Sequence, residues 1–478
     1  MFDASQMMIV VGVLLALVFL GTHIAVALGI TSALGIYLMM NGDMEVVRSF
    51  ISNTAYEGIR DYIFAVIPLF ILMGEFLARC GAAQDLFALV NRFTKWLPGR
   101  LGVATVLANA VFAFVTGVSI AAAAAFSRIA YPEMKRYGYD RQFSLACIAG
   151  SACLGMLIPP SVLMIVWGVL TEQSIGSLFL AGILPGMVVV LAYSAYIIVF
   201  ALRHPELVGE AARGGDAVFV TASGTAIAGG GGSGVGGGAP AVRMTSPHVE
   251  PEQSDAEFRR TIGGTLLVLA LIFAVLGGIW LGVFTPTEGA GVGATMALFV
   301  AIGRGMRLRQ VLEVVLSVGR TSAPLLLLLV MAQLYSRVLS MTGITGAVQS
   351  FFLDTGLPPL AILGIMIFIW FVLGCIIDSI SIILLTVPVF APIALALGYD
   401  PLAFAMIGII AIETGLLTPP FGILVFTVKA ALPNENVSVG EIFRGAIPFW
   451  ICLLAVIALI IAFPQIATWL PNLGKIGT

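Results

Sequence analysis

Residues 119–160 read SIAAAAAFSRIAYPEMKRYGYDRQFSLACIAGSACLGMLIPP, and this stretch occurs twice in the chain. The second copy, SISIILLTVPVFAPIALALGYDPLAFAMIGIIAIETGLLTPP at residues 379–420, lies 260 positions further on and aligns without a gap. The identical pairs are mostly residues that interrupt or cap helices: Ser119 with Ser379, Pro132 with Pro392, Gly138 with Gly398, Asp140 with Asp400, Gly155 with Gly415, and Pro160 with Pro420. Duplicated helix breakers in two apolar halves are typical of secondary transporters, which bind their substrate at the repeat interface.

The composition indicates a helical membrane protein. Of the 478 residues, 60% are hydrophobic and 10% are charged, whereas about a quarter of the residues in a soluble domain are charged. The long unbroken apolar runs exclude a transmembrane β-barrel, because barrel strands alternate apolar and polar residues. We therefore predict an all-α polytopic protein of the lipid bilayer, with two repeats that each contain a re-entrant helical hairpin and broken helices.

The sequence carries no pattern for enzymatic or nucleic-acid chemistry. Its five cysteines lie in apolar surroundings without metal-ligand spacing, and two of its three histidines lie in a polar linker. The glycine run at 229–238 is not followed by the Gly-Lys-Ser/Thr of a phosphate-binding loop. We expect no catalytic residues, no cofactor, no nucleic-acid partner, and no metal ion other than a coupling Na⁺.

The first half divides at its polar residues. Residues 1–61 predict N-terminal scaffold helices followed by an interfacial amphipathic helix. The apolar run from Met7 to Met40 fits either two short spans, broken at Gly21-Thr22-His23, or one long tilted span. Repeat 1 occupies residues 62–202. Its predicted elements are a re-entrant hairpin at 62–93, broken spans over 101–172 and an unbroken helix at 178–202.

A Gly-, Pro- and Ser-rich segment separates the halves. Residues 203–258 cannot bury enough apolar surface to fold alone and are predicted to form a disordered linker. Scaffold helices follow at 259–304, and repeat 2 fills residues 305–478. Its predicted elements are a hairpin at 324–352 interrupted by Gln333, Arg337 and Gly343, broken spans over 360–432, and a C-terminal helix at 446–468.

The charges predict that the two copies face opposite sides of the membrane. The loop from Pro132 to Asp140 carries Lys135 and Arg136, with Arg128 and Arg141 close by, whereas its counterpart at 392–400 has no Lys or Arg. Because Lys and Arg accumulate in cytoplasmic loops, we expect the first loop in the cytoplasm and the second outside.

The breaks at mid-span offer ligands for a cation. In the hydrocarbon layer unpaired backbone groups are costly, so a break persists where something else occupies the freed groups. Hydroxyl and carbonyl oxygens with few fixed charges suit Na⁺, and half-helix N-termini suit a carboxylate. The residues with such oxygens or with flexible backbone are Gly117, Ser119, Gly374, Asp378, Ser379 and Ser381. For any one of them taken alone, the alternative is a packing or kinking role.

Ionisable residues within apolar sequence suggest a substrate pathway. Glu75, Asp378 and Glu413 are acids that would be costly at membrane depth. Their alternative role is a structural hydrogen bond or a position at the interface. Arg79 and Arg337 either face an anionic substrate or extend to the interface. The pathway candidates are Glu75, Arg79, Ser161, Arg337, Ser381 and Glu413.

Several strings resemble the large membrane subunit of tripartite ATP-independent periplasmic (TRAP) transporters. They are IPLFILMGE at 67–75, GYD at 138–140, LIPPS at 157–161, SIGSLFLAG at 174–182 with Pro185-Gly186, GGI at 277–279 with FTPTE at 284–288, and TPPFG at 418–422. The resemblance extends over essentially the whole chain apart from the linker. The resemblance implies a multi-pass protein of the bacterial inner membrane. It also implies a Na⁺-coupled elevator, in which a mobile transport domain holding both hairpins moves against a scaffold.

The resemblance further implies partners and ion ligands. The partners are a small four-helix membrane subunit and a soluble periplasmic binding protein, which delivers an organic anion such as a C4-dicarboxylate, a sialic acid or another sugar or keto acid. By motif, the cation positions lie near Thr116, Gly117, Ser119, Gly155 and Pro160 in one half and near Gly374, Gly415, Thr418 and Phe421 in the other. The chain departs from the family in two ways. Its first break reads TGVS at 116–119 where the family usually has a Ser-Gly-Ser-Ser-like string, which leaves fewer hydroxyls, and its linker is unusually long.

Two other classes of function are weighed against this one. A self-sufficient Na⁺/organic-anion symporter or antiporter of similar architecture would transport as a purified single chain. A channel would turn over far faster than an alternating-access carrier, and a membrane enzyme would need a nucleophile–base or metal constellation that the sequence does not show.

Overall fold

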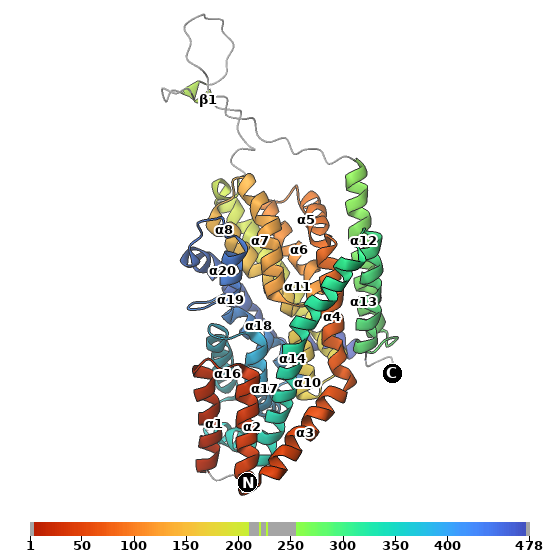
Figure 1. Cartoon of the computed structure of the whole chain (residues 1–478). Helices are drawn as coiled ribbons and strands as arrows, with labels where there is room; N and C mark the ends of the chain where they lie inside the picture. Colours follow the sequence, from red (N-terminus) through yellow and green to blue (C-terminus); the bar gives the residue numbers. More distant parts are fainter. Residues whose placement is uncertain (1–3, 210–218, 221–225, 228–254, 475–478) are drawn as a thin grey trace, which may run out of the picture.

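The computed structural model describes residues 4–209, 219–220, 226–227 and 255–474, and helices dominate these ranges (Figure 1). Among the described residues, seven helical segments are long and apolar enough to cross a membrane, and shorter apolar helices accompany them. The prediction of an all-α polytopic membrane protein is thus confirmed. Two strands of two residues each, β1 (Phe219–Val220) and β2 (Ala226–Ile227), pair antiparallel. Most of the predicted linker at 203–258 lies outside the described residues.

The helices of the first half are joined by short connections. They are α1 (Ala4–Phe19), α2 (Ile24–Met39), α3 (Met44–Arg60), the 3₁₀ turn η1 (Tyr62–Ala65), α4 (Val66–Arg79), α5 (Ala82–Phe93), α6 (Arg100–Thr116), α7 (Ser119–Arg136), α8 (Arg141–Ala152), α9 (Leu154–Leu157), α10 (Val162–Thr171), α11 (Ile175–Arg203) and η2 (Pro205–Leu207). The apolar run at 7–40 therefore forms two short helices, and the chain turns between them at Gly21, whose φ is +74°.

The second half repeats much of this order. Its helices are α12 (Asp255–Trp280), α13 (Pro286–Gly303), α14 (Leu308–Thr342), α15 (Ile344–Asp354), α16 (Pro359–Gly374), α17 (Ser379–Ala396), α18 (Pro401–Gly415), α19 (Ile423–Ala431), α20 (Val439–Ala462) and α21 (Gln465–Gly474). The duplicated Gly-Tyr-Asp string forms the same turn in both halves. Gly138 and Gly398 have φ of +73° and +83°, and the carboxylates of Asp140 and Asp400 accept backbone N–H bonds that cap α8 and α18.

The helices on either side of Gly117 fold back on each other. Phe112 in α6 and Phe126 in α7 pack edge to face with ring centroids 5.6 Å apart. At the far end of the pair, the Leu101 N–H donates to the Tyr139 hydroxyl over 3.2 Å. We call this pair hairpin 1. The predicted break at 116–119 is present, but the prediction of a span that continues through it is wrong. Gly117, with φ of +60°, reverses the chain.

The helices on either side of residues 375–378 form a second such pair, hairpin 2. The Trp370 indole N–H in α16 donates to the Thr386 hydroxyl in α17 over 2.8 Å, and the rings of Trp370 and Phe390 lie 5.3 Å apart. These contacts join residues on opposite sides of the tip, so the chain reverses here as well. In Figure 1, α6 and α7 lie in the upper half of the molecule and α16 and α17 in the lower half.

The segments predicted to be re-entrant hairpins have another structure. The chain turns at Gly81, but α4 packs mainly on α13, whereas α5 packs mainly on α6 and α12, so α4 and α5 do not pair along their lengths. In the second half, α14 runs unbroken through Gln333 and Arg337 and ends only at Gly343. The charge of Arg337 is compatible with a continuous helix, because its guanidinium forms an ion pair with Glu57 of α3 at 2.7 Å.

The two halves share one core. Trp167 of α10 packs against Trp370 of hairpin 2 and against Phe404 of α18, with ring centroids 6.0 and 5.9 Å apart. Gly408 makes room for this cluster, since a Cβ there would lie 2.7 Å from the Trp167 ring. At the C-terminal end of α7, Lys135 pairs with Glu435 of the loop after α19 at 2.6 Å. The hydrogen bond from Lys135 holds the pKa of this carboxyl below its usual value.

Candidate functional site

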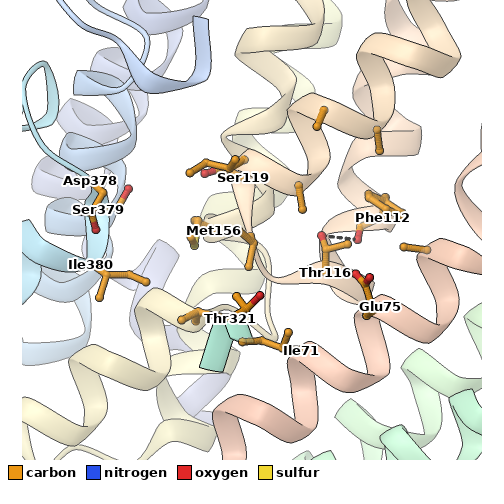
Figure 2. Close-up of a pocket in the computed structure, with 18 of the residues that line it drawn as sticks. Ile71, Glu75, Phe112, Thr116, Ser119, Met156, Thr321, Asp378, Ser379 and Ile380 are labelled. Carbon is orange, nitrogen blue, oxygen red and sulfur yellow. Dashed lines mark hydrogen bonds between the residues drawn. The ribbon is translucent and has the colours of Figure 1, made fainter. Parts of the chain in front are cut away.

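A cavity of about 540 Å³ lies between the tips of the two hairpins (Figure 2). Its walls come from α4, α7, α14 and the N-terminus of α17. The surface is mostly apolar, and its polar and charged lining residues are Glu75, Thr116, Ser119, Arg128, Thr321, Asp378 and Ser379. A mostly apolar cavity of a few hundred cubic ångströms with a few polar groups is typical of small-molecule sites.

The tip of hairpin 1 rests on the proline break of the neighbouring helix. The Val162 N–H, just after that break, donates to the Gly117 carbonyl over 3.2 Å. A Cβ at Gly117 would lie 2.5 Å from the Pro160 carbonyl oxygen, and a Cβ at Gly155 would lie 2.9 Å from the Ser119 Cα. The predicted residues Gly117, Ser119, Gly155 and Pro160 therefore form one backbone contact.

The tip of hairpin 2 makes an equivalent contact with the second proline break. The Phe421 N–H donates to the Cys375 carbonyl over 3.2 Å, and the Cys375 thiol lies 2.9 Å from the Thr418 hydroxyl. A Cβ at Gly374 would come within 2.8 Å of the Gly415 Cα. Only the backbone of Phe421 takes part, because its side chain is 57% exposed.

Glu413 lies where the two tips meet. Its carboxylate oxygen Oε1 accepts a 2.9 Å hydrogen bond from the Ser379 hydroxyl, and the Ser119 hydroxyl faces the same carboxyl group. Glu413 and Ser119 are each only 1% exposed. Among the described residues, neither Glu413 Oε2 nor Ser119 Oγ completes a hydrogen bond. Since buried polar atoms nearly always have a partner, these two oxygens mark a place for a small polar or cationic ligand.

At the breaks, the hydroxyl groups of Thr116 and Thr418 already donate their hydrogens to backbone carbonyls. Thr116 donates to the Phe112 carbonyl over 3.2 Å, and Thr418 donates to the Gly415 carbonyl over 2.8 Å. Their oxygen lone pairs remain available, because a hydroxyl carries one donor and two acceptor sites. Each hydroxyl oxygen, with the carbonyls freed at its own break, is of the type that suits a hard cation such as Na⁺.

Several pathway candidates do not point into the cavity. Arg337 pairs with Glu57 on α3 and also contacts Thr54, Ser161 donates to the Met156 carbonyl, and Ser381 donates to the Asp378 carboxylate over 2.6 Å. Arg79 lines a separate polar pocket beside Arg304 and Glu313. Glu75, whose carboxylate is paired with Arg79 at 2.8 Å, does line the cavity. The structure thus brings Glu75 and Asp378 to the cavity and leaves Arg337 outside it.

Sequence reasoning missed two polar residues of the lining, Thr321 of α14 and Arg128 of α7. No interruption in the apolar pattern marks Thr321. Arg128 was grouped with the basic loop that follows α7, yet it lies on the face of α7 shared by Ala121, Ala124 and Ala125. Helical spacing groups it with those alanines.

Comparison with known proteins agrees with the motifs. Residues 11–466 match the family described as "Tripartite ATP-independent periplasmic transporter, DctM component". The chain is 31% identical over 450 residues to the C4-dicarboxylate TRAP transporter large permease protein DctM of Pseudomonas aeruginosa, an overlap of 93% of this chain and 94% of that protein. It is 30% identical over 441 residues to the ectoine/5-hydroxyectoine TRAP transporter large permease protein UehC of Ruegeria pomeroyi, an overlap of 92% of each chain.

Among solved structures, the fold is similar to that of the YdaH transporter of Alcanivorax borkumensis. The TM-score is 0.59 at 13% identity, and the overlap covers 89% of this chain and 90% of that one. The sequence relatives are permeases and not enzymes, in agreement with the prediction that this chain is not an enzyme. With its apolar helices, the chain is a multi-pass protein of the bacterial inner membrane. The chain belongs to the DctM family and is the large membrane subunit of a tripartite ATP-independent periplasmic transporter.

Proposed function

We propose that this subunit couples the inward flow of Na⁺ to the uptake of a small organic acid, which a periplasmic binding protein delivers. The observation that carries the proposal is the cavity between the two hairpin tips. It places Ser119, Ser379 and Asp378 beside space for a small solute, at the two points where helices end inside an apolar core. Half-helix ends at such a point are the usual sites of substrate and coupling ions in secondary transporters.

The repeats are proposed to be inverted about an axis near Glu413. Cys153 and Glu413 occupy equivalent positions in the two copies, and the Cys153 thiol donates to the Glu413 carbonyl over 3.6 Å. Ser119 and Ser379, also equivalent, both face the Glu413 carboxyl group. Contact between equivalent residues is expected close to a twofold axis. The placement of the hairpins in opposite halves of Figure 1 supports an axis in the membrane plane.

The proposed Na⁺ ligands are the oxygens freed at the breaks. The first group is formed by Thr116, Gly117, Ser119, Gly155 and Pro160. The second is formed by Gly374, Gly415 and Thr418 with the backbone of Phe421, and Asp378 and Ser379 lie beside it at the start of α17. The unpaired oxygens of Ser119 and Glu413 support the first group in particular, because a bound cation would satisfy them.

Transport is proposed to follow an elevator mechanism. The hairpins and proline breaks are joined by backbone contacts at Gly117 and Gly374, which suits movement as one body. The opposite wall of the cavity, formed by α4 and α14, is proposed to be part of the scaffold. A small membrane subunit and a periplasmic binding protein complete the assembly that the family name describes.

Reconstitution tests the proposed function. Proteoliposomes that contain this chain, the small subunit and the binding protein are expected to accumulate radiolabelled acid only when Na⁺ is higher outside. Omission of Na⁺, of the small subunit or of the binding protein should each reduce uptake to the background of empty liposomes. Equal uptake by the purified single chain would contradict the proposal and favour a self-sufficient symporter.

A pair of serine variants tests the first Na⁺ group. Ser119→Ala removes a buried oxygen that has no protein partner, so the Na⁺ concentration for half-maximal uptake should rise about tenfold, as for one lost hydrogen bond to a charged group. The control is Ser127→Ala on the same helix, where the hydroxyl donates to the Ala123 carbonyl over 2.7 Å. The Ser127 variant should keep the wild-type Na⁺ dependence. If both variants keep it at normal expression, Ser119 is not a ligand.

A further inference from the structure

The cavity contains one charged side chain that no other described residue engages. Arg128 of α7 lines the cavity and forms no ion pair with any residue in the part of the chain that the structure describes. Arginine is permanently charged and carries a planar set of donors that matches a carboxylate. Arg128 is exposed, so its guanidinium is accessible to an anionic solute that enters the cavity.

The acids of the cavity do not supply that partner. Both carboxylate oxygens of Asp378 accept bonds from Ser381, one from its hydroxyl at 2.6 Å and one from its N–H at 3.0 Å. Glu75 is paired with Arg79 at 2.8 Å and also accepts a bond from Ser317 at 3.5 Å. Among the charged residues that line the cavity, Glu75 and Asp378 are thus engaged and Arg128 is not.

The wall between Arg128 and the hairpin tip is open to a ligand. Ala121, Ala124 and Ala125 line it and add little side-chain volume. The rise of an α-helix puts Arg128 about 13 Å from Ser119 along α7. Helical side chains lean toward the N-terminus of their helix, so a guanidinium at this position extends back toward the tip. Arg128 can thus meet a small acid that occupies the part of the cavity lined by these alanines.

We propose that Arg128 binds the carboxylate of the transported solute and selects for carboxylates over the corresponding amides. This inference rests on the proposed function. The C4-dicarboxylates and ectoine for which two relatives are named differ in size and in their other groups. A carboxylate is the charged group that they share, and a guanidinium binds it through two parallel hydrogen bonds. One arginine is sufficient for that common group.

Ligand binding to the membrane complex tests this assignment without the selectivity of the binding protein. The chain and its small subunit are placed in lipid nanodiscs, and thermal stabilisation is measured with succinate, ectoine and the corresponding amides, succinamide and ectoine amide. We expect Arg128→Gln to weaken binding of whichever acid, succinate or ectoine, the wild-type complex binds more tightly. The expected loss of affinity is about 10- to 100-fold, as for loss of a charge-assisted pair, whereas the affinity for the amides should change less than about twofold. Arg128→Lys, which keeps the charge but not the fork, should fall between them.

The matched control is Arg136→Gln, two turns further along α7. Arg136 lies outside the cavity lining and is 4.0 Å from Glu133, so acid binding should stay at the wild-type value. Weakening of acid and amide to the same extent in Arg128→Gln would indicate a structural role and overturn the proposal. Unchanged acid binding in Arg128→Gln would overturn the proposal too. So would a wild-type complex that takes up solute with Na⁺ but binds neither succinate nor ectoine. Failure of Na⁺-driven uptake in the wild-type assembly would instead refute the proposed function.

Discussion

Replacing Gly117 with alanine is expected to lower Na⁺-driven uptake at least about tenfold and to reduce the melting temperature of the protein. Gly117 has φ of +60°, a conformation that costs an L-residue about 1–2 kcal/mol. The new Cβ would also lie 2.5 Å from the Pro160 carbonyl oxygen. That oxygen belongs to the backbone and cannot rotate away, so overpacking adds about 1–3 kcal/mol. The tip of hairpin 1 would have to move off the proline break.

Gly138→Ala separates the two contributions. Gly138 has φ of +73°, close to that of Gly117, but a Cβ there meets nothing within 4 Å. This variant should show the cost of the backbone conformation alone and keep most of its uptake. Melting temperature and uptake are measured for both proteins in the complete assembly. Equal losses in the two variants would mean that the contact between Gly117 and Pro160 has no role.

Replacing Glu413 with leucine is expected to lower uptake roughly 5- to 150-fold, the range for one buried polar group left without a partner. The Glu413 carboxylate accepts the Ser379 hydrogen bond at 2.9 Å and faces Ser119 from the other tip. Leucine would leave the Ser379 hydroxyl buried and unpaired and would remove the link between the tips. Glu413→Gln keeps an acceptor oxygen at the same place, so its stability should stay close to that of the wild type.

The matched control is Glu133→Leu on α7. Glu133 is 39% exposed and lies 4.0 Å from Arg136, and loss of such a surface pair typically costs about 0.5 kcal/mol or less. Thermal unfolding and uptake are compared across the three variants. A Glu413→Leu protein that is as stable and as active as Glu133→Leu would show that Glu413 does not connect the hairpins.

The sequence located the interruptions in the helices but not the direction of the chain after each one. Gly117 and the duplicated proline pairs identify breaks from local chemistry, because their backbone preferences do not depend on distant residues. Whether the chain continues or turns back depends on long-range contacts such as Phe112 with Phe126. An apolar run with a central break looks the same in either case. For the same reason, α4 with α5, interrupted by charged residues, resembled a hairpin that the structure does not contain.

The candidate site was predictable where residues are duplicated and less so elsewhere. Ser119 and Ser379 appear at equivalent positions of the repeat, and the structure brings both to one carboxyl group. Arg337 was misleading, because a charge within an apolar helix looks the same whether it faces a cavity or an acid on α3 such as Glu57. Arg128 was overlooked because nearby basic residues made it part of a loop pattern. Side-chain direction in a folded helix bundle decides these cases.

The glycine contacts at Gly117 and at Gly374 bear on how this architecture has diversified. In both places main chain meets main chain at a separation that no side chain could share. The contacts that fix the tips are thereby made by backbone atoms and not by the side chains that border the solute. Lineages could exchange those bordering residues, and with them the preferred nutrient, without rebuilding the machinery that moves it. A single ancestral framework could in this way give rise to permeases for chemically dissimilar nutrients, as the names of the two relatives illustrate.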